Sequence, residues 1–456
     1  MGQPRHSFCI AGTQSGSGKT TLTLGLMAAL RQRGLTVQPF KCGPDYIDAG
    51  HHRHAAGRIS RNLDSWMMPP ASIPATFQNA CAGADVAVCE GVMGLFDGAS
   101  STELKGSTAE IALLTDMPVV LVVDARAMAR SIAALVAGYV HFEKDLRVCG
   151  IIANRVGSEG HARILREALA AAGLPPLLGC LPRDEAFHMP ERHLGLVADT
   201  EDAGVADRIE TLATAVESAV DIDQLLECSR NLNTKKQAEV ARSTVPVKLR
   251  MGLARDAAFY FYYEDNLDAL RARGVELVEF SPLNDAALPE DLDGLYIGGG
   301  FPEQFSAELS SNIAMHAALR AFAESGRPIF AECGGYMYLC RSLELPDGNR
   351  LPMAGVLAAD CVMRDKRQRL GYTKARSLQA GIFGSAGTNL RGHEFHWSEV
   401  VPDPGQTALF EVSDAHGRRQ EQVGIQQGNT HASYFHPHFA SNPAAVDAWV
   451  TALESD

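Results

Sequence analysis

The sequence lacks the marks of a membrane protein and of a nucleic-acid-binding protein. No stretch of its 456 residues approaches the roughly 18 consecutive apolar residues that a membrane-spanning helix requires. Lys and Arg number 41 against 54 Asp and Glu, and the net charge of −13 disfavours nucleic acid and anionic membrane surfaces as partners. The residues before the first apolar run are too few and too polar for a signal peptide, so we expect a cytoplasmic protein.

Cysteine pairing motifs are also missing. The ten cysteines form no CxxC pair and show no regular spacing, which disfavours a disulfide framework and a zinc site. Cys9, Cys89 and Cys149 lie in apolar runs, which is typical of small buried side chains. No internal repeat or low-complexity tract is present. The composition, 46% hydrophobic and 21% charged, is that of a globular protein, and the length predicts two or three domains.

Strands and helices alternate along the chain in two series. The first series opens with a strand over HSFCIAG, a helix over KTTLTLGLMAALRQRG that ends at Gly34, and a strand over LTVQPFKC. Its apolar runs do not alternate, which predicts strands buried on both faces in a parallel α/β sheet. The polar residues 227–247 read as a linker. The predicted domains are therefore 1–226 and 248–456, and the second ends in shorter, antiparallel strands.

A glycine-rich loop joins the first predicted strand to the first predicted helix. Its sequence, AGTQSGSGKT, predicts a phosphate-binding loop, because glycines let backbone N–H groups turn towards phosphates at a helix N-terminus. Lys19 would neutralise the terminal phosphates, and the hydroxyl of Thr20 can ligate Mg²⁺. The residues predicted to bind the nucleotide are Gly16, Gly18, Lys19, Thr20 and Thr21.

Two positions distinguish this loop from other phosphate loops. Thr13 stands where the strict pattern has its first glycine, and Gly12 precedes it. Gln14 stands where partition-type ATPases carry a second lysine. The loop instead resembles that of dethiobiotin synthetase and its relatives, which use ATP to activate a carboxylate.

Acidic residues follow later strands of the first series. Asp45, Glu90 and Asp97 stand in glycine-rich turns at predicted strand ends, where ligands bind in doubly wound sheets. Carboxylates beside a phosphate loop predict Mg²⁺ binding, here by Asp45 and Glu90 together with Thr20. Asp124, which ends another strand, is the weakest candidate of this group.

Lys41 and residues 51–54, of sequence HHRH, form a cationic cluster in the same region. The spacing of its histidines does not match the helical i, i+4 pattern of a metal site. We interpret the cluster as a cationic lip for a substrate that carries carboxylates, since Arg and Lys pair well with carboxylates.

Three blocks carry a family resemblance. FKCGPDYID, NLDSW at 62–66 and EGVMGLFDG, in this order after the phosphate loop, closely resemble the cobyrinic acid a,c-diamide synthase family, and the likeness runs the length of the chain. The resemblance implies an N-terminal P-loop domain with a doubly wound parallel sheet, and a C-terminal flavodoxin-like class I glutaminase domain. By motif match, Lys19, Thr20, Asp45 and Glu90 have nucleotide and metal roles, and Tyr46 and Asp97 lie near the substrate carboxylate or the attacking ammonia.

The activity implied by the resemblance is ATP-, Mg²⁺- and glutamine-dependent amidation of the a and c acetate side chains of cobyrinic acid, through an acyl phosphate. Hydrogenobyrinic acid and nickel-sirohydrochlorin are alternative substrates within the family. A different class, a nucleotide-switched ATPase with a vestigial glutaminase domain, is disfavoured by the absent second lysine and by the residues of the C-terminal half. A homodimer is a possible assembly.

The C-terminal half contains a candidate nucleophile. Residues 328–337, PIFAECGGYM, predict a strand, a sharp turn and a helix with Cys333 at the turn, as in a nucleophile elbow. We expect Cys333 to be exposed, with the helix N-terminus favouring its thiolate. Residues 298–300, three glycines after a predicted strand, can supply backbone N–H groups to an oxyanion.

The base is predicted among the C-terminal histidines. Class I glutaminase domains carry His-Pro-Glu, with His as the base and Glu orienting it; here the sequence is His436-Pro437-His438. His436 therefore matches the base, His438 replaces the glutamate, and the group that orients His436 stays open. Residues 393–396, HEFH, are one residue short of the zinc-protease motif and are interpreted as a strand end.

Overall fold

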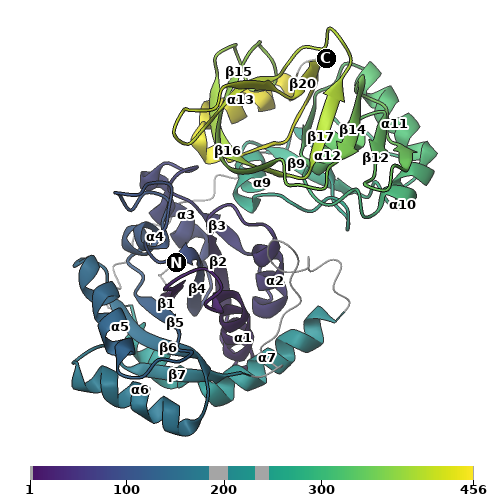
Figure 1. Ribbon diagram of the computed structural model, residues 1–456. Coiled ribbons are helices and arrows are strands. Elements are labelled where there is room, and N and C mark those ends of the chain that lie inside the picture. The colour runs from purple at the N-terminus through teal and green to yellow at the C-terminus, as the bar shows by residue number, and fades with distance from the viewer. Residues whose placement is uncertain (1–3, 184–203, 232–245, 455–456) are drawn as a thin grey trace. The chain divides into compact units, whose positions relative to one another are not determined.

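The computed structural model describes residues 4–183, 204–231 and 246–454. The chain forms two compact units, Met1–Val240 and Ala241–Asp456 (Figure 1). The division point lies inside the linker predicted at 227–247, most of which is outside the described residues. Among the described helices, none is long and apolar enough to cross a membrane.

The first unit contains a seven-stranded parallel sheet with the order β3-β2-β4-β1-β5-β6-β7 (Figure 1). Its strands are β1 (His6–Gly12), β2 (Val37–Cys42), β3 (Arg61–Leu63), β4 (Val86–Gly94), β5 (Val119–Asp124), β6 (Val148–Val156) and β7 (Leu177–Pro182). The strand order reverses beside β1, which lies between β4 and β5. The loops after β1 and β4 therefore open at a topological switch point, as the predicted doubly wound fold requires.

Helices cover both faces of this sheet. They are α1 (Lys19–Gln32), α2 (Ile47–Ala56), α3 (Ile73–Ala80), α4 (Thr108–Thr115), α5 (Ser131–Phe142), α6 (Glu159–Ala171), α7 (Val205–Ala219) and α8 (Ile222–Cys228), with the 3₁₀ helix η1 (Pro70–Ser72) before α3. Phe8 and Ile10 of β1 pack with α1 and α7 in one hydrophobic core. Helix α1 stops before Gly34, whose φ of 82° is left-handed, so the predicted helix end is confirmed.

The described part of the first unit extends beyond residue 226. Helix α8 continues to Cys228, and Arg230 forms an isolated antiparallel bridge with His6. The side chain of Asn231 donates to the carbonyl oxygen of Pro4 at 2.7 Å. The chain therefore stays in contact with the start of β1 as far as residue 231.

The second unit contains a six-stranded sheet with the order β20-β21-β11-β10-β8-β9. The strands are β8 (Leu249–Ala254), β9 (Val275–Phe280), β10 (Gly294–Ile297), β11 (Ile329–Glu332), β20 (Ile425–Gln427) and β21 (Thr430–Ser433). All pairs are parallel except that of β20 with β21. The five parallel strands follow the 2-1-3-4-5 order of flavodoxin, in agreement with the predicted fold.

Two further sheets complete the second unit. One has the order β13-β12-β14-β17 and the other β19-β18-β15-β16-β22. Their strands are β12 (Ser342–Glu344), β13 (Arg350–Pro352), β14 (Ala359–Met363), β15 (Arg369–Ser377), β16 (Asn389–His396), β17 (Ser398–Pro402), β18 (Phe410–Asp414), β19 (Glu421–Val423) and β22 (Phe435–Pro437). The strand pairs are antiparallel, as predicted, except for the parallel pair of β12 with β14. The predicted shortness is wrong for β15 and β16, which have nine and eight residues. The helices are α9 (Glu264–Arg271), α10 (Ser306–Ser311), α11 (Ile313–Glu324), α12 (Gly334–Leu339), α13 (Pro443–Leu453) and the 3₁₀ helix η3 (Phe439–Ser441).

Candidate active sites

The glycine-rich loop connects β1 to α1 at the switch point of the first sheet. Gly16 and Gly18 have φ of 72° and 93°, which side chains rarely tolerate. A Cβ on Gly18 would lie 2.1 Å from the side-chain nitrogen of Asn154, which itself donates to the Ser17 carbonyl oxygen at 2.8 Å. The loop is thus held from β6 by a residue that the sequence reasoning missed, because only the fold brings Asn154 close.

Lys19 begins α1, and its side chain is buried against the loop. Its ammonium group donates to the carbonyl oxygens of Gln14 at 3.2 Å and of Met93 at 2.6 Å. Burial lowers the pKa of Lys19. These two weakly charged acceptors hold the ammonium inside the loop, where phosphate oxygens can replace them. Thr21 lies half-buried in the first turn of α1.

Glu90 of β4 is the centre of a buried charged cluster beside the loop. Its Oε1 accepts from the hydroxyl of Thr20 at 2.5 Å and from Nζ of Lys41 at 2.8 Å. Its Oε2 lies 2.7 Å from Nε2 of His52 on α2. Lys41 also pairs with Asp48, at 2.6 Å. The structure therefore joins the predicted metal residues Thr20 and Glu90 directly.

The cluster fixes the charge state of its members. Burial opposes ionisation of Glu90, but Lys41 and His52 outweigh it and hold the pKa of Glu90 well below its ordinary value. Burial likewise opposes the charge on Lys41, yet Asp48 and Glu90 raise its pKa well above the ordinary value. Burial, and then the charge of Asp45, raise the pKa of Asp48 to about 8. A Lys41–Glu90 ion pair thus persists next to the loop.

This arrangement corrects the predicted cationic lip. Lys41, His51 and His52 are buried, whereas Arg53 and His54 are exposed. Lys41 and His52 face the Glu90 carboxylate because β2 and α2 pack beside β4. Lys41 and His52 are therefore directed into the interior beside the phosphate loop, and Arg53 and His54 are the members of the cluster that stay at the surface.

Asp45 and Tyr46 lie after β2, at the start of α2. The Oδ1 atom of Asp45 accepts from the backbone N–H of Asp48 at 2.9 Å, and its backbone oxygen accepts from Asn62 at 2.9 Å. Tyr46 is the N-cap residue of α2 and is half-buried. Asp45 acts on the charged cluster through space, since its charge raises the pKa of Asp48 and that of Lys41.

Asp97 is exposed in the loop after β4. Its Oδ2 accepts from the backbone N–H of Gly94 at 2.9 Å, and its charge acts on Lys19. The neighbouring Leu95 donates to the Gly12 carbonyl oxygen at 2.8 Å, which ties this loop to the phosphate loop. Asp97 is therefore held beside the phosphate loop.

Asp124, the weakest acidic candidate, forms ion pairs with two arginines. Arg126 and Arg155 lie 2.8 Å and 2.6 Å from its Oδ2, and Arg155 also donates to the Gly16 carbonyl oxygen at 3.1 Å. The Asp124 side chain thus braces the phosphate loop through Arg155. The hydroxyl of Tyr139 braces the loop from α5 by donating to the Thr13 carbonyl oxygen at 2.6 Å.

In the second unit, Cys333 stands at a sharp turn between β11 and α12. Its φ is 47°, and its backbone N–H donates to the Ser433 carbonyl oxygen at 2.8 Å. Glycines make the turn possible: a Cβ on Gly335 would lie 2.4 Å from the backbone oxygen of Ile297. A strained residue at a strand-to-helix turn is the geometry of a nucleophile elbow, as predicted.

The expected exposure of Cys333 is wrong. The side chain is buried, and its Sγ lies 3.6 Å from the carbonyl oxygen of Phe395 in β16. Burial, and then the charge of Glu303, raise the pKa of the thiol well above its ordinary value. The thiol is covered by β16, which is distant in the sequence. Helix α12 has only six residues, so its N-terminus stabilises a thiolate less than expected. The thiol therefore needs a base.

His436 of β22 lies next to the elbow. A Cβ on Gly299 would lie 2.7 Å from its Cε1 and 3.5 Å from its Nε2, so this edge of the ring faces the glycine loop after β10. The same loop meets the elbow, since a Cβ on Gly334 would lie 3.0 Å from the backbone nitrogen of Gly300. Nδ1 of His436 lies 2.9 Å from Oε2 of Glu332. The candidate nucleophile, the glycine loop and the candidate base thus share one site.

His438 does not take the place of the missing glutamate. Its Nδ1 accepts from the backbone N–H of Ala440 at 3.3 Å, which caps η3, and its ring packs 5.0 Å from that of Tyr263. Burial lowers the pKa of His438 to about 4. The carboxylate that contacts Nδ1 of His436 is instead that of Glu332.

The segment 393–396 forms the end of β16, as predicted. The ring of His393 stacks on that of His436, with centroids 4.9 Å apart, and its Nδ1 lies 2.8 Å from the hydroxyl of Tyr263. His396 stacks on Tyr434 at 3.7 Å. These histidines pack around the base.

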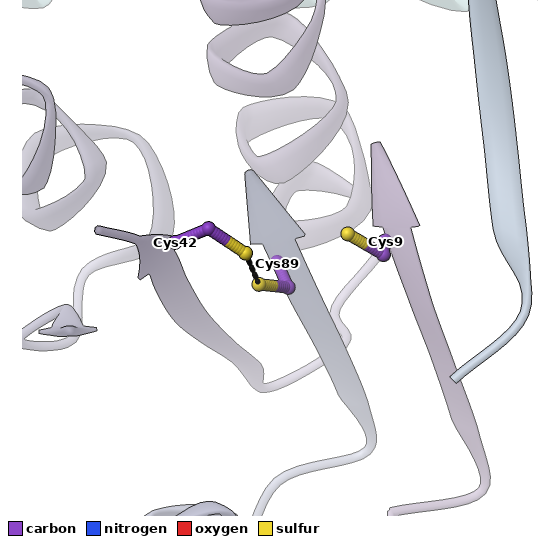
Figure 2. Close-up of side chains that lie close together, drawn as sticks. All are labelled: Cys9, Cys42 and Cys89. Carbon is purple, nitrogen blue, oxygen red and sulfur yellow. Dashed lines mark hydrogen bonds between the residues drawn. The ribbon is translucent and has the colours of Figure 1, made fainter. Parts of the chain in front are cut away.

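Cys9, Cys42 and Cys89 come together on three strands of the first sheet (Figure 2). Their sulfur atoms all lie within 4.8 Å of one another, and those of Cys42 and Cys89 are 3.4 Å apart. Neighbouring thiols and burial raise the pKa of Cys89 well above its ordinary value, which keeps this thiol protonated. The predicted burial of Cys9 and Cys89 is confirmed, and Cys149 is half-buried. We interpret the cluster as packing in the sheet interior.

Two family models match the chain. The CobQ/CobB/MinD/ParA nucleotide binding domain matches residues 8–197, and the CobB/CobQ-like glutamine amidotransferase domain matches residues 250–444. These matches agree with the phosphate loop of the first unit and the elbow of the second.

Curated relatives align with both units together. A cobyrinate a,c-diamide synthase of Syntrophotalea carbinolica is 49% identical over 99% of this chain and 98% of its own length. The enzymes of the same name from Listeria innocua and Salmonella typhimurium are 45% and 42% identical, over 97% and 99% of this chain and 98% and 99% of their own lengths. By its two domains and by these full-length relatives, the chain belongs to the cobyrinate a,c-diamide synthase family.

Proposed function

We propose that this chain is a glutamine-hydrolysing ligase that uses ATP to amidate the a and c acetate side chains of cobyrinic acid. The observation that supports the proposal is that the side chains for both half-reactions come together on one chain. Lys19, Thr20 and Glu90 meet at the phosphate loop of the first unit, and Cys333 and His436 both lie beside the glycine loop of the second. The substrate is taken from relatives named cobyrinate a,c-diamide synthase, which align over nearly the whole chain.

The residues at the phosphate loop fit Mg²⁺. Mg²⁺ prefers oxygen ligands, and the hydroxyl of Thr20 and the ionised carboxylate of Glu90 are 2.5 Å apart. Glu90 already accepts from Lys41 and lies against His52, so it suits the hydrogen bonding of the Thr20 hydroxyl and of metal-bound water better than direct ligation. Asp45 is the further oxygen donor that we propose. When bound with ATP, the ion would neutralise phosphate charge.

Activation of the carboxylate is assigned to the first unit. A carboxylate does not react with ammonia directly, because oxide would have to leave. The carboxylate oxygen attacks the γ-phosphorus of ATP, ADP leaves, and an acyl phosphate forms. Lys19 stabilises the negative charge on the phosphoryl oxygens, and ammonia then displaces phosphate to give the amide. We propose that Tyr46 and Asp97, held at the ends of β2 and β4, position the acetate or the ammonia.

Ammonia production is assigned to the second unit. His436 takes the proton of the Cys333 thiol as sulfur bonds to the side-chain carbonyl carbon of glutamine. The proton passes to the amide nitrogen, the carbon–nitrogen bond breaks, and ammonia leaves a thioester. Water then hydrolyses the thioester to glutamate. Because burial disfavours the thiolate, the resting enzyme should hold a neutral thiol until substrate and base act together.

Two variants separate the sites. Cys333→Ser should lose glutamine-dependent synthesis by orders of magnitude, since an unactivated hydroxyl is a far poorer nucleophile. It should still form the diamide from ammonium salts at mildly alkaline pH. Lys19→Ala should lose synthesis from both nitrogen donors, because both need the acyl phosphate. Chromatography and mass spectrometry of the corrinoid product measure synthesis from each nitrogen donor. Cys340 is also buried in the second unit, and Cys340→Ala is the matched control that should keep both activities.

Loss of the ammonia-dependent reaction in folded Cys333→Ser protein would contradict the two-site scheme. Retention of ammonia-dependent synthesis by Lys19→Ala would contradict the role of the loop. The rates of amidation of cobyrinic acid, hydrogenobyrinic acid and nickel-sirohydrochlorin are compared in the same assay. Faster amidation of either alternative would make that compound the substrate in place of cobyrinic acid. A nucleotide-switched ATPase with a vestigial glutaminase domain would hydrolyse ATP without forming amide in any arm.

Three further predictions remain proposals. The linker between the domains is proposed within residues 227–247, the location as cytoplasmic, and the assembly as a homodimer. Light scattering of the purified chain measures its mass in solution against the 48.9 kDa of one copy. A mass of one copy would contradict the dimer.

A further inference from the structure

Glu332 is the last residue of β11 and directly precedes Cys333. Its side chain is 1% exposed, and both carboxylate oxygens have partners. Oε2 lies 2.9 Å from Nδ1 of His436, and Oε1 accepts from the hydroxyl of Tyr296 at 2.6 Å. A buried carboxylate one residue from the nucleophile, bonded to the base, is the constellation that the His-Pro-His sequence leaves missing.

We propose that Glu332 positions His436 and stabilises its positive charge during glutamine hydrolysis. Glu332 takes the role of the usual glutamate, whose place in the sequence is occupied by His438. The inference rests on the proposed roles of Cys333 and His436. Glu332 acts through His436 and is a positioning residue.

The hydrogen bond decides the tautomer of His436. An ionised carboxylate only accepts, so Nδ1 must carry the proton and Nε2 must keep its lone pair. The Cε1–Nε2 edge faces the glycine loop at Gly299, which is the side of the elbow. The base is therefore presented to the thiol, and the imidazolium that forms on proton transfer has a counter-ion already in contact.

The groups around His436 favour this arrangement in the buried interior. Burial raises the pKa of Glu332, and the bond to His436 opposes that shift. Burial, and then the Glu332 charge, raise the pKa of Tyr296 well above its ordinary value, so its hydroxyl stays a donor. Burial, and then His436, hold the pKa of His393 well below its ordinary value. The stacked His393 therefore stays neutral. Glu332 is then the group that balances the positive charge of the His436 imidazolium.

Position in the fold explains why this carboxylate can replace the usual one. β11 lies next to β21, and Glu332 pairs in register with Ser433, three residues before His436. The Glu332 side chain contacts Tyr296 and His436, and the turn begins at the next residue, Cys333.

The test is Glu332→Gln in the full-length enzyme. Gln keeps the shape and removes the charge. The kcat for glutamine-dependent synthesis should fall about 10²- to 10⁴-fold, as for loss of a carboxylate behind a catalytic histidine, with the KM for glutamine nearly unchanged. Ammonia-dependent synthesis should stay within about twofold of the parent, because the other unit carries it out.

The pH profile gives a readout that a structural role would not move. The acidic limb of kcat/KM for glutamine should shift to lower pH in Glu332→Gln, because the charged imidazole loses its counter-ion. Glu394→Gln is the matched control: Glu394 is also buried in the second unit, and it pairs with Arg419. It should not move the profile.

An unchanged kcat and profile in Glu332→Gln would overturn the proposal, as would equal losses with glutamine and with ammonia. The proposed function is tested separately in the same assay. If Cys333→Ser is inactive with glutamine, the proposed function stands even when Glu332→Gln overturns the role of Glu332. Should Glu332→Gln fail to fold, Tyr296→Phe tests the same carboxylate. It removes the second hydrogen bond and should lower kcat with glutamine about 3- to 10-fold without affecting ammonia-dependent synthesis. No change in Tyr296→Phe would then overturn the proposal.

Discussion

Single residues at the phosphate loop are coupled through the Glu90 carboxylate. Thr20, Lys41 and His52 all bond to it, and it is fully buried. Breaking a buried ion pair is costly, because the partner's charge remains in the interior. The effect of a substitution at Glu90 therefore reaches both the Thr20 hydroxyl, which we propose as a metal ligand, and Lys41.

Glu90→Gln should raise the Mg²⁺ concentration needed for half-maximal ammonia-dependent synthesis by about 10- to 100-fold, the usual cost of losing an outer-shell partner. The reason is that the Thr20 hydroxyl loses its charged acceptor. A Mg²⁺ titration at saturating ATP measures it. Glu110→Gln, in the same unit, is the control. A titration curve that overlays the parent's would place Glu90 away from the metal.

At the scale of elements, both sites lie at the carboxyl ends of parallel strands. The phosphate loop follows β1, Asp97 follows β4, the triple-glycine loop follows β10, and Cys333 follows β11. Within each unit, adjacent parallel strands bring two of these turns together although their residues are far apart in the chain. At the elbow, backbone also lies close to backbone.

Gly335→Ala tests whether the elbow depends on this close approach. The new Cβ would lie 2.4 Å from the Ile297 backbone oxygen, which cannot rotate away, so the turn must shift. We expect a loss of about 1–3 kcal/mol in the free energy of unfolding of the second unit. Glutamine-dependent synthesis should fall at least tenfold while ammonia-dependent synthesis is kept, because small displacements of a nucleophile are costly.

The control for the elbow is Gly138→Ala. Gly138 lies in helix α5 with open space around its Cβ position, so alanine should be neutral or stabilising by up to about 1 kcal/mol. Denaturant unfolding and the two synthesis assays report on both variants. Normal glutamine-dependent activity in Gly335→Ala would contradict the tight packing of the elbow.

At the scale of the whole molecule, buried neutral histidines make the second unit sensitive to acid. Burial lowers the pKa of His396, His431 and His438 to about 4. The unfolded chain takes up protons near the ordinary histidine value, whereas the folded chain does so only at lower pH. Stability is therefore fully present above the ordinary value and is lost as pH falls towards 4, by about 1.4 kcal/mol per pH unit for each histidine.

His438→Asn should reduce this loss. Asn can cap η3 as His438 does, but it does not titrate. Between about pH 7 and about pH 5, the variant should lose about 2 kcal/mol less unfolding free energy than the parent. Hydrogen exchange of peptides from the second unit measures the change locally. An identical pH dependence in parent and variant would mean that His438 is not held neutral by burial.

Contiguous residues were enough to predict the family, the two α/β units, the phosphate loop and the elbow. Each of these depends on short-range patterns: apolar runs for buried strands, glycines for left-handed turns, and a fixed order of motif blocks. The ends of β1 and α1, and the strand at HEFH, agree with the structure for the same reason. Residue types alone also pointed to Cys333 and His436 as the nucleophile and the base that we propose.

Partners that come from distant strands were decided only by the tertiary structure. No local pattern shows that His52 reaches Glu90, that Asn154 supports the phosphate loop, or that Phe395 covers the Cys333 thiol. Burial is a property of the packed chain, so it reversed the expected exposure of Cys333 and turned a cationic lip into a buried ion-pair cluster. The same packing brings Glu332 to His436, since a carboxylate can support a base from any strand that reaches it.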